Sequence, residues 1–338
     1  MSTFDNYTIF GMHSNAERYS WAAYHLFVAL SSLIGDTLIL YASFQKDAFR
    51  LNKFIVTVIR CIAVSDLAYT IVRVLPGTIS LIAGKWVLGN GICIASVYLY
   101  NFIYLAGMFF ITVLTTSKLL LLKYPIRCAI LTSNTALQIC SLALIPPLTI
   151  PMIMLIVDNE DVTFDYRLYV CSYGFKAEPW KKILPPLSVF ILFLPNFVLI
   201  ATTIPTLRYL AVARKSARRV RGSVPWQGAL TVVLTATTYC VSTLPLCIQF
   251  IGKMFFTDPR GMFHFQFYRL AMFTAMINIM SNFYIYALTV KSFQRFLSSK
   301  VLSILSNFSP ATEVVPSIGK YILHFKLRLV FVDSQRPD

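Results

Sequence analysis

Seven long apolar runs dominate the sequence and restrict the folds that are open to it. They cover residues 21–44, 54–83, 94–122, 135–157, 183–207, 227–252 and 265–290. Each run reaches the roughly 20 residues that a helix needs to cross the hydrocarbon core of a bilayer. Backbone groups in that core must bond within their own segment, so such runs fold as helices. We therefore predict an all-α membrane protein whose residues 21–290 form a seven-transmembrane helix bundle.

Composition argues against the classes of soluble protein. Hydrophobic residues make up 57% of the chain and charged residues only 13%, which is too apolar for one soluble core. The net charge of +16 does not indicate a nucleic-acid partner, because the cations lie between the apolar runs rather than on one polar domain. The chain has no zinc-protease, phosphate-loop or nucleophile-elbow motif, so we predict no enzymatic activity and no cofactor beyond an ion.

Charge between the runs predicts the orientation in the membrane. Lysines and arginines concentrate in the segments after the odd-numbered runs, including Arg218 and Arg219 after run five. By the positive-inside rule these segments are cytoplasmic, which makes residues 1–20 an extracellular N-terminus and residues 291–338 a cytoplasmic helix and tail. We expect a multi-pass protein of the plasma membrane whose basic segments contact anionic lipids. Asn6 begins a glycosylation sequon on the predicted outer side.

Two cysteines stand apart from the other five. Cys93 precedes run three and Cys171 precedes run five, both on the predicted outer side, where the compartment is oxidising. The others lie within apolar runs or on the cytoplasmic side, where thiols stay reduced. A bridge between Cys93 and Cys171 is chemically reasonable, and two free thiols are the alternative.

Short motifs follow one another in a fixed order along the runs. They are Gly35-Asp36 in run one, Ala63–Leu67 (AVSDL) in run two, Trp86–Cys93 (WVLGNGIC) before run three, Tyr124–Arg127 (YPIR) after it, Pro195 in run five, Pro245 in run six and Asn282–Tyr286 (NFYIY) at the end of run seven. This series resembles the motifs of the rhodopsin-like (class A) G-protein-coupled receptors over about residues 21–300. The resemblance implies a Cys93–Cys171 disulfide, a short amphipathic eighth helix after run seven, an extracellular ligand within the bundle and a heterotrimeric G protein as intracellular partner.

The polar residues inside the runs are candidates for an ion site, because charged groups in a bilayer are costly. In the resembled family the run-two aspartate, here Asp66, holds a sodium ion with asparagines of run seven. Asn278, Asn282 and Tyr286 recur at helical spacing on one face, and Asp36 adds a second acid. Two carboxylates in a low dielectric either share a proton or hold a cation firmly. A polar network that only packs helices is the alternative.

A basic and aromatic pocket is predicted toward the outer side. Arg73 lies seven residues after Asp66, hence on the same helix face and about 10 Å nearer the outside. Tyr100 and Tyr104 of run three and Arg269 of run seven complete the predicted pocket. A guanidinium binds planar anions well, so the ligand would be an acidic small molecule or peptide. Alternatively, Arg73 pairs with an acid of the outer loop.

The resemblance also identifies a signalling face, where the chain departs from the family. Ser117 and Lys118 stand where the family has the aspartate and arginine of Asp-Arg-Tyr, so the cation remains without its adjacent acid. Pro245 and Tyr286 are the activation residues of runs six and seven that the resemblance implies, and the basic segment after run five would contact the G protein. Two alternatives stay open: a receptor-like protein that does not couple normally to G protein, and a seven-helix transporter.

Overall fold

The computed structural model describes most of the chain. It covers residues 15–45, 48–49, 51–124, 126, 130–157, 162–165, 168–173, 180–217, 226–255 and 262–308. Among the sequence predictions, Asn6, Arg218 and Arg219 lie outside the described residues.

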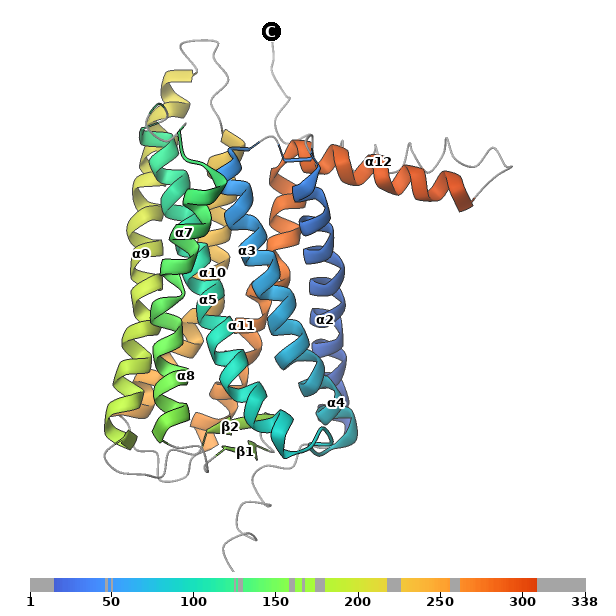
Figure 1. The fold of residues 1–338 in the computed structure, drawn as a ribbon, viewed down its shortest axis with the longest axis vertical. Helices are drawn as coiled ribbons and strands as arrows, with labels where there is room; N and C mark the ends of the chain where they lie inside the picture. Colours follow the sequence, from blue (N-terminus) through green and yellow to red (C-terminus); the bar gives the residue numbers. More distant parts are fainter. Residues whose placement is uncertain are drawn as a thin grey trace, which may run out of the picture.

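Long helices lie side by side along the long axis of the molecule, and one further helix extends across their end (Figure 1). In chain order the helices are α2 (Asn15–Phe44), α3 (Lys53–Tyr69), η1 (Thr70–Val74), α4 (Leu75–Ala83), α5 (Asn90–Lys123), α7 (Ser133–Ala143), α8 (Ile145–Val157), α9 (Trp180–Ala217), α10 (Trp226–Phe255), α11 (Met262–Thr289) and α12 (Lys291–Phe308). The predicted helical bundle is confirmed, with α3, η1 and α4 forming one span and α7 and α8 another.

Five of these spans have the length and hydropathy of membrane-crossing helices among the described residues: 15–44, 53–83, 90–123, 230–249 and 267–289. Their outer faces carry large exposed apolar side chains such as Ile34, Phe44 and Val241. In water such a surface would be unfavourable, whereas in a bilayer it contacts lipid. The exposed residues therefore agree with a bundle that crosses the membrane.

Prolines explain where two spans depart from a regular α-helix. Residues Thr70–Val74 form a π-helical turn in which the Leu75 N–H bonds to the Thr70 carbonyl. Pro76 follows directly and cannot donate to the preceding turn. The α7–α8 span breaks at Leu144, before Pro146 and its neighbouring proline, for the same reason.

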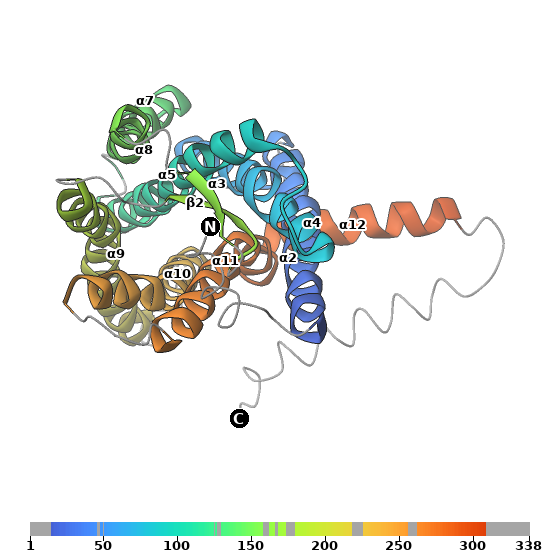
Figure 2. The same cartoon turned by 90° about the horizontal axis from the view of Figure 1, so that it is seen from below.

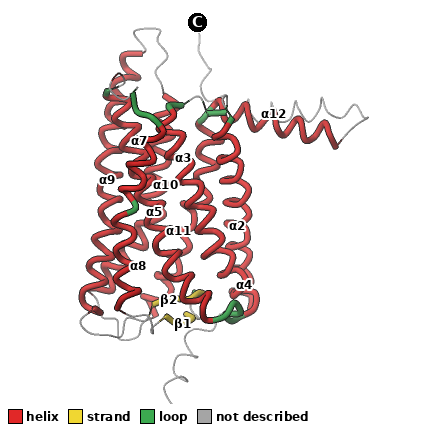
Figure 3. The backbone as a smooth tube through the Cα atoms, viewed as in Figure 1, coloured by secondary structure: helices red, strands yellow, loops and turns green. Residues whose placement is uncertain are grey.

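A short β-hairpin covers one end of the bundle and was not predicted from the sequence. Strands β1 (Val162–Asp165) and β2 (Val170–Tyr173) pair antiparallel, with Phe164 opposite Cys171. Figure 2 shows the hairpin lying across this end, and Figure 3 shows that strand structure in the described part of the chain is confined to it. We call this end the disulfide end and the opposite end the α12 end.

Close packing at the α12 end joins α2, α11 and α12. Gly35 of α2 lies so near α11 that a Cβ there would be 2.6 Å from Cβ of Phe283. Nearer to α12, Phe293 of that helix is fully buried and stacks on Phe49 with the ring centroids 5.0 Å apart. The buried aromatic residue fixes the start of α12 against the bundle.

Candidate functional site

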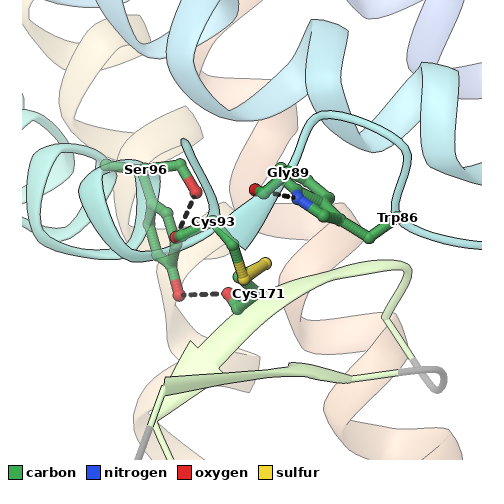
Figure 4. The surroundings of a disulfide bond; sticks show 6 residues. Trp86, Gly89, Cys93, Ser96 and Cys171 are labelled. Atoms are coloured by element: carbon green, nitrogen blue, oxygen red, sulfur yellow. Dashed lines mark hydrogen bonds between the residues drawn. A yellow bond between two sulfur atoms is a disulfide. The ribbon is translucent and has the colours of Figure 1, made fainter. Parts of the chain in front are cut away.

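The disulfide end is organised by a bond between Cys93 and Cys171, which confirms the predicted bridge. It ties the first turn of α5 to strand β2, with the two Cα atoms 5.5 Å apart (Figure 4). Beside it the Trp86 indole donates a hydrogen bond to the Gly89 carbonyl at 2.8 Å, closing the turn before α5. Gly89 has a φ of 82°, which favours glycine at this turn. The hairpin is thereby held against the helices below it.

Arg73 lies deep beneath the hairpin, on the π-helical turn η1. Its side chain is 3% exposed, and its guanidinium carbon lies 4.9 Å from the centroid of the Tyr100 ring. The atoms Nε and Nη1 of Arg73 are buried without a hydrogen-bond partner. Tyr104, one turn further along α5, packs against Tyr69 with the ring centroids 5.7 Å apart. Three of the four residues predicted for the pocket therefore lie together.

Arg269, the fourth predicted residue, contacts side chains of α2. It forms an ion pair with Glu17 and lies over the ring of Trp21. Trp21 in turn stacks on Phe273 of α11 at a centroid distance of 3.6 Å. The Arg269 charge is therefore already matched by a carboxylate of this chain.

His25 is a buried polar residue of this region that the sequence prediction missed. It is 1% exposed, and neither ring nitrogen has a hydrogen-bond partner. Glu17, Trp21 and His25 follow one another at intervals of four residues, which places them on one face of α2. That spacing is a signal from which their common role could have been found.

The middle of the bundle holds the predicted polar network. Asp36 accepts a hydrogen bond from Ser32 at 2.7 Å, and Asp66 accepts one from the Asn282 amide at 2.7 Å. The Thr70 hydroxyl links the two acids, because it lies within hydrogen-bond distance of both the Ser32 hydroxyl, at 2.8 Å, and the Asp66 carbonyl, at 2.9 Å. Asn278 is buried nearby, but among the described residues its side chain makes no hydrogen bond to either acid.

The donor set of this network suits a hard cation such as sodium. Oδ1 of Asp36 and Oδ1 of Asn282 are both buried without a hydrogen-bond partner. Carboxylate and amide oxygens are the ligands that hard cations prefer. Among the described residues, however, no group of three or more acids, histidines or cysteines could hold a metal. A sodium ion at Asp66 stays a prediction.

The α12 end brings together two predicted activation residues. Lys118 of α5 is only 8% exposed, and its Nζ lies 5.9 Å from the centroid of the Tyr286 ring of α11. Tyr286 is buried and meets Phe49 edge to face. Ser117 is buried as well. The cation of α5 therefore contacts the last aromatic residue of the run-seven motif.

Pro245 lies in α10 beside hydrogen bonds that link this helix to α9. The Thr243 hydroxyl donates to Oδ1 of Asn196 at 2.9 Å. The Asn196 amide also lies 3.7 Å from the sulfur of Cys247. Proline within a membrane helix frees a carbonyl, and polar neighbours of this kind support the altered segment.

Comparisons with known proteins found matches both to the sequence and to the fold of this chain. The family described as 7 transmembrane receptor (rhodopsin family) matches residues 35–286. The crystal structure of squid rhodopsin matches with a TM-score of 0.72 and 13% sequence identity, covering 92% of this chain and 92% of that chain. No curated protein matches the sequence significantly. At 13% identity, the likeness to squid rhodopsin shows the fold alone.

Proposed function

Because the chain belongs to the rhodopsin family of seven-transmembrane receptors, we propose that it binds an extracellular ligand at the disulfide end and activates a heterotrimeric G protein at the α12 end. Members of this family are multi-pass membrane proteins and not enzymes, and this chain is one of them. In the proposed orientation the disulfide end faces the outside of the plasma membrane. The charge distribution of the connecting segments supports this orientation.

The buried arginine supports a ligand with an acidic group. An isolated cation in a low-dielectric interior is costly, by several kcal/mol even after relaxation. Arg73 has two nitrogen atoms without a hydrogen-bond partner and an aromatic ring beside it. A ligand carboxylate would offset this cost by supplying both the opposite charge and the acceptors. The proposed ligand is therefore an acidic small molecule, or a peptide that inserts an acidic group.

The observation that carries the signalling proposal is the contact between Lys118 and Tyr286. Contact of a lysine with an aromatic face is worth about 0.5 to 2 kcal/mol, depending on burial. It joins α5 to α11 at the two positions that family resemblance implicates in activation. The acid that would neutralise the cation is replaced by Ser117. We therefore propose that the resting state is weakly latched and that the receptor signals without ligand.

The test is basal activation of each G-protein class in cells that express the native chain, Ser117→Asp or Lys118→Met. An epitope at the N-terminus, stained on intact cells, measures surface level and orientation together. The native chain should raise one class above mock-transfected cells. Ser117→Asp should lower this signal because it supplies the missing acid, and Lys118→Met should change it because the contact with Tyr286 loses its charge.

Two results would contradict the proposal. Surface-stained cells with no signal in any class would favour the receptor-like protein that does not couple normally. Equal signals from the native chain and both variants, at equal surface level, would remove Lys118 from the activation mechanism.

A further inference from the structure

We infer that His25 and Arg73 form a subsite for a monocarboxylate between α2 and η1, and that Glu17 keeps Arg269 out of it. This inference rests on the proposed function, because it names the class of ligand that the pocket accepts. It adds a residue of α2 to the pocket and reduces the number of charges available to the ligand to one.

His25 contributes a buried imidazole that lies beside the backbone of Val74. Both ring nitrogens are buried without a hydrogen-bond partner. The ring lies 5.3 Å from Phe273, and its Nδ1 would be 3.3 Å from a Cβ at position 77. A Cβ at position 77 would crowd the imidazole and also Cγ1 of Val170 at 3.3 Å, so glycine allows α4 and the hairpin to pack close to His25. The imidazole is therefore enclosed by α2, α4, α11 and β2.

Arg73 supplies the charge of the subsite. It lies on η1, which packs against α2, the helix that carries His25. No acid among the described residues forms an ion pair with it, and its Nε and Nη1 lack hydrogen-bond partners. A π-helical turn often marks a functional site because it changes the direction of one side chain, and Arg73 lies on such a turn. Guanidinium and imidazole together can donate to the oxygens of one anion.

The charge balance selects the class of anion. Arg269 is paired with Glu17, so binding a second negative group there would require displacing a carboxylate of the chain. Among the pocket residues that the structure describes, Arg73 is the cation without an ion pair, and a single cation suits a monoanion. Several N–H donors suit oxygen acceptors better than a halide. The walls include Tyr100 and Phe273, which suit an apolar or aromatic body. A monocarboxylate with an aromatic body, rather than a dicarboxylate, fits these features.

The experiment measures thermal unfolding of the purified full-length receptor in lipid nanodiscs, with choline benzoate as the probe. Choline chloride and choline succinate at the same ionic strength are the comparison salts, so that no sodium contributes to the shift. Benzoate should raise the melting temperature of the native protein by a few degrees in a saturable way, because a ligand that binds only the folded state stabilises it. Chloride and succinate should give no saturable shift.

Variants separate binding from folding. Arg73→Met should abolish the benzoate shift while leaving the ligand-free melting temperature unchanged or higher, because it removes a buried unpaired charge. His25→Leu should raise the half-saturating benzoate concentration at least several-fold. Arg269→Gln should leave the benzoate shift intact. Glu17→Gln should create a succinate shift, because it removes the carboxylate that pairs with Arg269.

The inference is overturned by a benzoate shift that survives in Arg73→Met, by the absence of a benzoate shift in the native protein, or by an equal shift with chloride. A benzoate shift lost in Arg269→Gln but kept in His25→Leu would also overturn it. The assay contains no G protein, so these results are independent of whether the receptor signals. A receptor that binds benzoate without coupling contradicts the proposed function alone.

Discussion

Replacing Gly35 by alanine should weaken the contact between α2 and α11 on which the polar network depends. The new Cβ would lie 2.6 Å from Cβ and 2.8 Å from Cγ of Phe283. Carbon atoms in contact prefer separations of about 3.5 to 4.0 Å, so the two helices must separate by about 1 Å. The Cβ of Phe283 is fixed to the backbone, and a change of rotamer therefore gives no relief.

The magnitude follows from two opposing effects. Overpacking of this kind costs about 1 to 3 kcal/mol. Alanine is preferred over glycine in a helix by about 1 kcal/mol, which offsets part of the loss. The net loss is therefore up to about 2 kcal/mol, which corresponds to a melting temperature lower by up to about 4 °C for a chain of this size.

Thermal unfolding of the receptor in nanodiscs measures this change, with Gly91→Ala as the matched control. Gly91 is also in a helix, but a Cβ there would meet nothing within 4 Å. The control should melt at or slightly above the native temperature. If Gly35→Ala melted as high as Gly91→Ala, α2 and α11 would not be as close as described and the packing argument would be refuted.

Three further predictions use the same unfolding assay. Cys171→Ser opens a bridge spanning 78 residues, worth about 4 kcal/mol by chain entropy, and should lower stability and surface level, unlike Cys240→Ser at a free cysteine. Replacing choline by sodium should raise the melting temperature of the native protein, and it should raise that of Asp36→Asn by less. Identical melting of the native protein in both salts would exclude the sodium site. Thr243→Val removes the donor to Asn196 and should cost about 1 to 3 kcal/mol, whereas an unchanged melting temperature would exclude a role for this hydrogen bond.

The spans could be predicted because bilayer thickness imposes a length that the sequence displays directly. The runs 94–122 and 265–290, for example, correspond to helices Asn90–Lys123 and Met262–Thr289. Irregularities within a span were harder to predict, because proline predicts a disturbance but not its form. Pro76 is preceded by a π-helical turn, whereas the helix before Pro146 is interrupted by a turn at Leu144.

The pocket was partly predictable for a related reason. The interval from Asp66 to Arg73 is a helical period, so the sequence alone places Arg73 on the inner face. The partner of Arg269 is Glu17, 252 residues away, and no local pattern indicates such a pairing. The hairpin above the pocket was equally unpredictable, since its short strands form against the disulfide and the helices rather than by their own pattern.

We propose that this chain activates G protein from the end where Lys118 contacts Tyr286. The most direct measurement is guanine-nucleotide exchange on purified heterotrimeric G proteins of each class, with the full-length receptor in nanodiscs and no ligand. We expect the native receptor to accelerate exchange on at least one class above empty nanodiscs, and we expect Ser117→Asp to reduce this acceleration. Exchange equal to that with empty nanodiscs for every class, with a receptor shown to be folded by its melting transition, would contradict it.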